Sequence, residues 1–379
     1  MNDLLRQEIA TAATTVVVKV GTRVLTRADG TLNLDRIGSL AEELHQLIEG
    51  GRRVVLVSSG AVGAGIDRLG LSDRPRDLAR LQAVAAVGQS ALIEAYDQTF
   101  RQHGRHAAQV LLTADGLDDR ARYLNVRNTI LMLLKYGAIP IINENDTVAV
   151  DELMASFGDN DRLAALVTNL IRAPLLVILS DVDGLYDGDP DDASATLVPT
   201  VTALDDTVLG YVRDRATGHS RGGMASKLEA ARVVTLAGEN VIIANGRTPG
   251  VLGRIMAGQL EGTLLVAQGK SISPWKRWIG FSVQPRGRLL LDEGACRAIA
   301  QQGRSLLAIG IVQSLGSYRK GDVVALCDAA NTEFARGLIN YDAEQISVIQ
   351  GLQSDQIAVA LGHHPYDEVV HRDNLAVLA

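Results

Sequence analysis

Short, continuous apolar runs that alternate with helical stretches constrain the fold of this chain more than any other feature. A run without polar alternation is typical of a parallel strand that is buried on both faces. Such runs occupy residues 15–20, 53–57, 107–112, 138–142, 175–179 and 241–244. The segments between these runs include 34–49, 78–100, 123–134 and 163–171, which have apolar residues at helical spacing or many small residues and are expected to be helices. This alternation predicts an α/β fold with a mainly parallel sheet.

The composition changes after Gln268, and the change predicts a second domain. Residues 271–274 have the character of a linker. Beyond it we expect one helix at 293–301 among short strands at 276–282, 287–291, 315–318, 322–326, 334–338 and 357–359. With 379 residues, 47% of them hydrophobic, the chain can build two cores. We therefore expect domains at 1–270 and 275–379, the second small and β-rich.

Composition also excludes several classes of protein. The longest apolar runs, such as 174–179, are far shorter than the ~20 residues that a membrane span needs. The N-terminus has no basic region before an apolar core, so no signal peptide is expected. Cys296 and Cys327 form no CxxC pair, which favours a cytoplasmic protein. A net charge of −7 argues against a protein that coats nucleic acid.

Residues 140–161 are the candidate active site. A buried strand ends there in Asn143-Glu144-Asn145-Asp146, and a second polar cluster, 158–161, precedes the helix expected at 163–171. Ligands of open parallel sheets bind at the carboxyl ends of the strands. Carboxylate and amide oxygens there suit an ammonium group, and helix N–H groups suit a carboxylate, so a small zwitterion fits. The alternative is that Asp159, Asn160 and Asp161 only cap the helix.

Three further features favour phosphate binding. Lys19 ends the first apolar run and faces a glycine turn, although a lysine on an edge strand would look the same. The small-residue turn 58–65 brings N–H groups toward an anion, although tight helix packing explains such glycines equally well. A loop expected over 187–226 ends in glycines before a helix at 228–237. Lys227 begins that helix, where a cation opposes the helix dipole unless an anion is bound.

Eight motifs occur in the order that is typical of the amino acid kinase family, which the chain resembles. They are VVVKVGTRVLT, LVSSGAVGAG, AVAAVGQ, PIINENDTVAV, FGDNDRLAALV, LLVILSDVDGLYDGDP, GGMASK and IIANGR. The C-terminal segments LLLDEGACRAI, GRSLLAIGI, KGDVVAL and ARGLINYD resemble a PUA domain. The resemblance implies a three-layer αβα sandwich around a mostly parallel eight-stranded sheet, followed by the small β-rich domain.

The resemblance also implies residue roles. Lys19, Lys227 and Asp161 are the implied catalytic residues, with Asp161 holding the two lysines. Glutamate binding is implied for Ser59, Asp146 and Asn160. ATP binding is implied for Lys19, Ser180, Asp181, Arg221, Gly222, Gly223, Met224, Ala225, Ser226 and Lys227. Two of these depart from the common pattern, since Ser220-Arg221 replaces a usual Gly-Thr pair and Ser180 replaces a frequent threonine.

The implied activity is ATP-dependent phosphorylation of the γ-carboxylate of L-glutamate, the first step of proline biosynthesis. Mg²⁺ enters with ATP, and no protein metal site is expected. Proline as feedback inhibitor, a homo-oligomer and channelling to glutamate-5-semialdehyde dehydrogenase are further expectations. Alternatives are an acetylglutamate, aspartate, carbamate or uridylate kinase, or an RNA-binding or RNA-modifying protein. Residues 271–379 carry ten basic and eleven acidic residues, which disfavours RNA binding.

Overall fold

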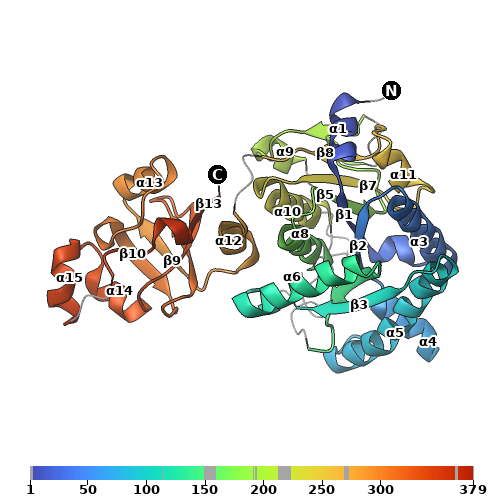
Figure 1. Ribbon diagram of the computed structural model, residues 1–379, viewed down its shortest axis with the longest axis horizontal. Helices are drawn as coiled ribbons and strands as arrows, with labels where there is room; N and C mark the ends of the chain where they lie inside the picture. Colours follow the sequence, from blue (N-terminus) through green and yellow to red (C-terminus); the bar gives the residue numbers. More distant parts are fainter. Residues whose placement is uncertain are drawn as a thin grey trace. The chain divides into compact units, whose positions relative to one another are not determined.

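The computed structural model describes residues 3–113, 115–148, 159–190, 192, 194–211, 223–268, 273–362 and 366–378 (Figure 1). They divide into two compact units, Met1–Lys270 and Ser271–Ala379. No helix among these residues is long and apolar enough to cross a membrane.

The first unit is built on an eight-stranded sheet in the order β3-β4-β2-β1-β5-β7-β8-β6. Its strands are β1 Thr15–Val20, β2 Arg53–Ser58, β3 Ala107–Leu112, β4 Ile139–Glu144, β5 Leu175–Ser180, β6 Thr200–Val201, β7 Asn240–Asn245 and β8 Thr263–Leu265. Every neighbouring pair is parallel except β7 with β8. The predicted α/β class is confirmed.

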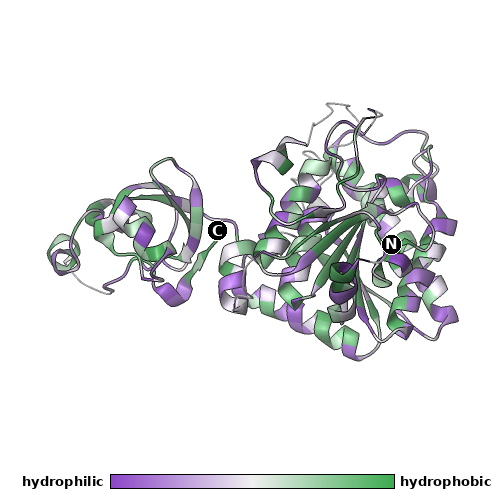
Figure 2. Cartoon of the chain, turned by 90° about the horizontal axis from the view of Figure 1, so that it is seen from above, coloured by the Kyte–Doolittle hydropathy of each residue, from purple (hydrophilic) through white to green (hydrophobic). Residues whose placement is uncertain are grey.

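Two layers of helices cover this sheet (Figures 1 and 2). One layer holds α1 Leu4–Ala12, α3 Leu34–Glu49, α5 Leu78–Gln102 and α11 Val251–Met256. The other holds α6 Arg120–Lys135, α8 Asp159–Ile171 and α10 Met224–Leu236. The shorter α2 Thr22–Leu25, α4 Ala61–Leu69, α9 Asp206–Gly210 and the 3₁₀ turn η1 Asp115–Leu117 complete the unit.

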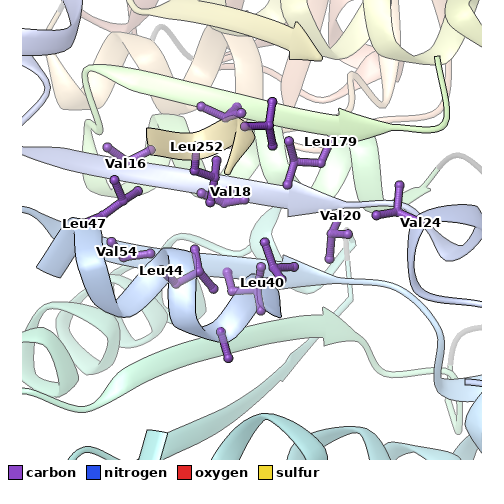
Figure 3. Packing of buried hydrophobic residues seen from close by; sticks show 14 of the residues in the cluster. Val16, Val18, Val20, Val24, Leu40, Leu44, Leu47, Val54, Leu179 and Leu252 are labelled. Atoms are coloured by element: carbon purple, nitrogen blue, oxygen red, sulfur yellow. The ribbon is translucent and has the colours of Figure 1, made fainter. Parts of the chain in front are cut away.

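The apolar strands divide their side chains between these two layers. Val16, Val18 and Val20 of β1 pack with Leu40 and Leu44 of α3 in one core (Figure 3). Because side chains alternate along a strand, Val17 and Lys19 point toward the other layer. All six residues of β1 are buried, which is why its sequence reads as a continuous apolar run broken only by a lysine.

A buried ion pair ties α3 to the start of α11. Glu43 Oε1 accepts from Arg36 Nη1 at 3.2 Å and from Gly250 N at 3.1 Å, while Glu43 Oε2 accepts from Leu252 N at 3.1 Å. Arg36 Nε donates to Gly246 O at 2.8 Å. Glu43 thus both caps the amino end of α11 and neutralises a buried guanidinium.

Glu43→Ala should lower the free energy of unfolding by about 3–5 kcal/mol, because it leaves Arg36 buried without its counter-ion. Denaturant titration measures this. Glu94→Ala is the matched control, since the Glu94 pair with Arg68 is exposed on both sides and should contribute less than about 1 kcal/mol. Equal losses in the two variants would show that burial of the Glu43 pair carries no extra stability.

The second unit holds a five-stranded sheet in the order β10-β9-β11-β12-β13. Its strands are β9 Gly287–Leu291, β10 Ile311–Gly316, β11 Val323–Cys327, β12 Glu333–Leu338 and β13 Leu375–Val377. Its helices and turns are α12 Pro274–Arg277, the π-helix η2 Trp278–Ser282, α13 Glu293–Ala300, η3 Ala308–Gly310, α14 Ala343–Ile349, α15 Ser354–Leu361 and η4 Arg372–Asn374. The expectation of a small β-rich unit is confirmed.

Two strands predicted in the second unit are wrong. Residues 276–282 are the end of α12 and the π-helix η2, in which all five residues are buried. A helix that is buried all round shows no 3.6-residue period, so its sequence resembles a buried strand. Residues 357–359 lie within α15, whose start is fixed by a capping box between Gln353 and Gln356.

Three boundaries in the first unit also differ from prediction. The supposed loop 187–226 contains β6 and α9, and Asp205 caps α9 by accepting from Val208 N at 3.0 Å. Helix α10 begins at Met224, so Lys227 is its fourth residue rather than its start. Helix α8 begins at Asp159, which places Asn160 and Asp161 inside its first turn rather than before it.

Candidate active site

The predicted site residues gather at the carboxyl ends of four adjacent strands, β4, β2, β1 and β5. Lys19 lies near the end of β1, Ser59 directly after β2, Asp146 just beyond β4, and Ser180 at the end of β5. The strand ends are level, because Val20 pairs with Ser58 on one side and with Leu179 on the other. These residues line one cavity of about 430 Å³ together with Asn143, Asn160, Asp161, Asp181 and Lys227.

Asp161 joins the two lysines. Its Oδ1 lies 2.6 Å from Lys19 Nζ, and its Oδ2 lies 3.2 Å from Lys227 Nζ. Ser226 Oγ donates to Oδ2 at 3.4 Å, a contact that the motifs did not predict. Asp161 is 1% exposed, and each lysine is 5% exposed. Three elements, β1, α8 and α10, thus place two cations on opposite oxygens of one carboxylate.

The three buried charges of Asp161, Lys19 and Lys227 compensate one another, and none of them would be stable here without the others. Burial favours the neutral acid, yet Lys19 and Lys227 hold the pKa of Asp161 below its ordinary value of 3.8. Burial lowers the pKa of Lys19, and the charge of Lys227 lowers it further, while Asp161 acts in the opposite direction. Removal of Asp161 would leave two buried ammonium groups without their common partner.

Ser59, Asn143 and Asn160 form a hydrogen-bonded set beside this cluster. Asn160 Nδ2 donates to Ser59 Oγ and to Asn143 Oδ1, at 3.1 Å each. Helix capping therefore does not explain Asn160 and Asp161, because their side chains bond to other elements. The side chain of Asp159 and residue Gly158 lie outside the described part of the chain.

The glycine-rich turn after β2 serves helix packing, one of the two alternatives left open by the sequence, and it also places Ser59 at the cavity. Gly60 has φ 110°, a conformation that L side chains rarely adopt, and it starts α4 right after Ser59. Gly65 serves packing instead, because a Cβ there would lie 1.9 Å from Val84 O of α5. A Cβ at Gly88 of α5 would likewise lie 1.8 Å from Ala61 O. The turn positions Ser59, and its later glycines let α4 and α5 touch.

Asp146 lies half-buried at the far side of the cavity from the β5 end. Burial raises its pKa from 3.8 to about 6, against the charge of Arg74. Arg74 also lines the cavity and was not singled out from the sequence. A carboxylate held in this way is available to a cationic group of a ligand.

The side expected to hold ATP is described in part. Ser180 Oγ donates to Asp181 Oδ1 at 3.3 Å, and both residues line the cavity. Gly223 precedes the first turn of α10 at Met224, Ala225 and Ser226 and makes no side-chain capping hydrogen bond, and the amino end of a helix is a place where anions bind. Arg221 and Gly222 lie outside the described residues.

Sequence reasoning missed Arg23. Its Nη1 lies 3.1 Å from Asp181 Oδ2, and its backbone oxygen accepts from Arg247 Nη2 at 3.0 Å. Arg23 lines the same cavity as Lys19. Its position directly after Gly21-Thr22, at the end of a central strand, was the available signal.

Comparison with known proteins identifies the family of this chain. The model of the amino acid kinase family matches residues 14–245, and that of the PUA domain matches residues 287–361. The chain belongs to the amino acid kinase family. The first match covers the eight-stranded sheet through β7, so the cavity lies in the amino acid kinase part.

Relatives within the amino acid kinase family resemble the whole chain. A glutamate 5-kinase of Rhodopirellula baltica is 48% identical over 99% of this chain and 97% of its own. A glutamate 5-kinase of Thermoanaerobacter sp. is 45% identical over 96% and 97%. The solved carbamate kinase from Giardia lamblia bound to AMP-PNP aligns over 68% of this chain and 100% of its own, at 18% identity and a TM-score of 0.48. The chain is thus a kinase with an attached PUA domain.

The donor groups in the cavity suit phosphate better than a resident metal. No three metal-binding side chains cluster among the residues that the structure describes. Asp161 is engaged by two lysines and Asp181 by Arg23. Ammonium groups and the amino end of α10 are instead groups that bind phosphate oxygens.

Proposed function

We propose that the chain transfers the γ-phosphoryl group of ATP to the γ-carboxylate of L-glutamate, giving ADP and γ-glutamyl phosphate. The Lys19–Asp161–Lys227 cluster carries this proposal, because it holds two cations at the inner end of a cavity that also has groups for a zwitterion. The glutamate 5-kinase relatives support the same reaction and the same acceptor.

Positioning and charge account for the chemistry. The γ-carboxylate is already ionised near neutral pH, so its oxygen can attack without a general base. A new O–P bond forms as the bond from the γ-phosphorus to the β–γ bridging oxygen breaks, and ADP leaves with that electron pair. Lys19 and Lys227 offset the repulsion between two anions and the charge that spreads over the transferring group. Asp161 acts as a positioning residue that orients both lysines.

Substrate and nucleotide occupy opposite sides of the cluster in this proposal. Asp146 faces the α-ammonium of glutamate, and Ser59 and Asn160 complete its site. Ser180, Asp181 and residues 221–227 hold ATP. Mg²⁺ accompanies ATP and supplies charge neutralisation on the phosphates.

A hydroxamate assay tests the function, because hydroxylamine traps an acyl phosphate. ATP-dependent hydroxamate should form with L-glutamate far faster than with L-aspartate or N-acetyl-L-glutamate, and carbamate should not support ADP release. A different preferred acceptor would assign the chain to another branch of the family.

The KM for glutamate should rise as the pH falls from about 7 to about 5. Asp146 has a pKa of about 6 in the free protein, so below that pH it becomes neutral and loses its attraction for the ammonium. The γ-carboxyl group, with a pKa of about 4.3, stays ionised over the same range. Initial rates at saturating ATP measure the effect. Asp146→Asn should raise the KM for glutamate at neutral pH and make this KM independent of pH. If the KM of the variant still rises at low pH as in the wild type, a group other than Asp146 causes the rise.

Proline is proposed to inhibit by overlapping the glutamate site, since both ligands offer an ammonium and an α-carboxylate to the same polar groups. Excess glutamate should relieve the inhibition. Inhibition that persists at saturating glutamate would place proline elsewhere.

The unit Met1–Lys270 is proposed to carry catalysis alone, because every described residue of the site belongs to it. A chain ending at Gln268 should keep turnover within about tenfold, or ~1.4 kcal/mol in the barrier. Circular dichroism and a cooperative melt establish first that it is folded. A folded truncation that binds both substrates without turnover would place the PUA unit in the catalytic machinery.

The remaining proposals concern the setting of the enzyme. We propose that it is a cytoplasmic homo-oligomer that passes its labile product to glutamate-5-semialdehyde dehydrogenase and binds RNA weakly at most. Sedimentation gives the oligomeric state, and a coupled assay with an acyl-phosphate trap gives the channelling.

A further inference from the structure

Three side-chain amides form a chain from the protein interior to the cavity. Asn143 Nδ2 donates to Gln89 Oε1 at 2.8 Å, and Asn160 Nδ2 donates to Asn143 Oδ1 at 3.1 Å. The three residues come from α5, β4 and α8. Asn143 and Asn160 line the cavity, whereas Gln89 lies buried next to Asn143, with 7% of its surface exposed.

The chain has a direction, because each amide has one accepting and one donating end. Gln89 presents its oxygen, so Asn143 turns its nitrogen toward Gln89 and its oxygen toward Asn160. Asn160 then turns its nitrogen toward Asn143 and Ser59. Its Oδ1 is left buried and without a hydrogen-bond partner among the described residues.

A buried carbonyl oxygen without a protein partner can accept a hydrogen bond from a ligand. The α-ammonium of an amino acid has three N–H donors and suits this oxygen, while a carboxylate would be repelled by it. If Gln89 offered no acceptor, Asn143 and Asn160 would be free to rotate by 180° about their last side-chain bond. Asn160 would then offer a donor to the cavity in place of an acceptor.

We propose that Gln89 is a positioning residue that fixes the orientation of Asn160 and thereby makes the site select acceptors with a free α-ammonium group. This inference rests on the proposed function, since it takes L-glutamate as the substrate. It assigns a role to a residue that lies behind the cavity wall and next to Gly88, at the close contact between α5 and α4.

The test compares L-glutamate with glutarate, which lacks only the α-ammonium, in the hydroxamate assay. Gln89→Met keeps the size of the side chain and removes the acceptor, so the ratio of kcat/KM for glutamate to that for glutarate should fall roughly tenfold. The KM for ATP should change less than about twofold, since no member of the amide chain is placed at the nucleotide. Gln89→Glu retains an acceptor and should keep the wild-type ratio. Its second oxygen replaces Gln89 Nε2, which has no partner in the described part of the chain.

Tyr96→Phe is the matched structural control. It removes one buried hydrogen bond from the same helix, between Tyr96 OH and Ser58 Oγ at 3.1 Å, and leaves the three amides in place. It should lower the melting temperature without changing the ratio. If Gln89→Met does not fold, Asn143→Ala interrupts the same series of hydrogen-bonded amides and is assayed in the same way.

Four results are distinguishable. A wild-type protein that forms no ATP-dependent hydroxamate with glutamate overturns the proposed function and this inference with it, whereas one that uses glutarate as well as glutamate overturns this inference alone. A wild-type preference that Gln89→Met leaves unchanged overturns the role of Gln89 alone, even if both rates fall. A ratio that falls in Gln89→Met and is kept in Gln89→Glu and Tyr96→Phe supports it.

Discussion

Replacing Lys19 or Lys227 with alanine should lower kcat by roughly 10²–10³-fold, or ~2.7–4 kcal/mol, by analogy with the loss of one preorganised donor to transition-state charge. Both ammonium groups are buried against Asp161, so a water molecule in the place of either one would not restore the lost positive charge. The KM for glutamate should change much less, because the two cations act mainly on charge that develops during transfer.

Steady-state kinetics with both substrates varied measure this effect. Arg68→Ala removes a cation that is exposed and paired with Glu94 outside the cavity, and it should leave kcat unchanged. A raised KM for glutamate at unchanged kcat in Lys19→Ala would reassign Lys19 to substrate binding.

Asp161→Asn should destabilise the protein by about 3–5 kcal/mol, the cost of leaving a buried charge without its partner. The folded protein lowers the pKa of Asp161, so this carboxylate stabilises the wild type above its unfolded pKa and ceases to do so as the pH falls through the folded value. The stabilities of wild type and variant should therefore differ most near neutral pH and converge in acid.

Urea titrations between about pH 7 and about pH 3 test this convergence. Asp35→Asn is the control, because the side chain of Asp35 is almost fully exposed. A difference between wild type and Asp161→Asn that stays constant with pH would mean that packing, not charge, is the role of Asp161.

The elements that surround the chemistry were the most predictable from sequence. Strand β1 and helix α3 have the predicted bounds. A strand that is buried on both faces has an unbroken apolar run, and a helix that is buried on one face has apolar residues with a 3.6-residue period. The buried π-helix η2 was taken for a strand, since burial on all sides erases the period that separates the two.

Contacts between distant residues were less predictable. The motifs implied that Lys19, Asp161 and Lys227 act together, but only the sheet order places β1 beside β5 and lets α8 and α10 cover the same face. Arg23 and Gln89 belong to ordinary helical stretches, and what distinguishes them is a partner far along the chain. The place of Arg23 after Gly21-Thr22 signals the end of a strand, but nothing local in the sequence identifies the partner of either residue.

The alternation of side chains along β1 has a consequence for how this protein can change. Val16, Val18 and Val20 belong to the hydrophobic core, whereas Lys19 faces α8 and α10. Substitutions on the valine side can accumulate and compensate one another without reaching the reaction. Insertion or deletion of a single residue in β1 before Lys19 would not be tolerated, because it would point the lysine into the core and a valine toward the phosphate. The strand is therefore permissive to substitution and intolerant of a change in length.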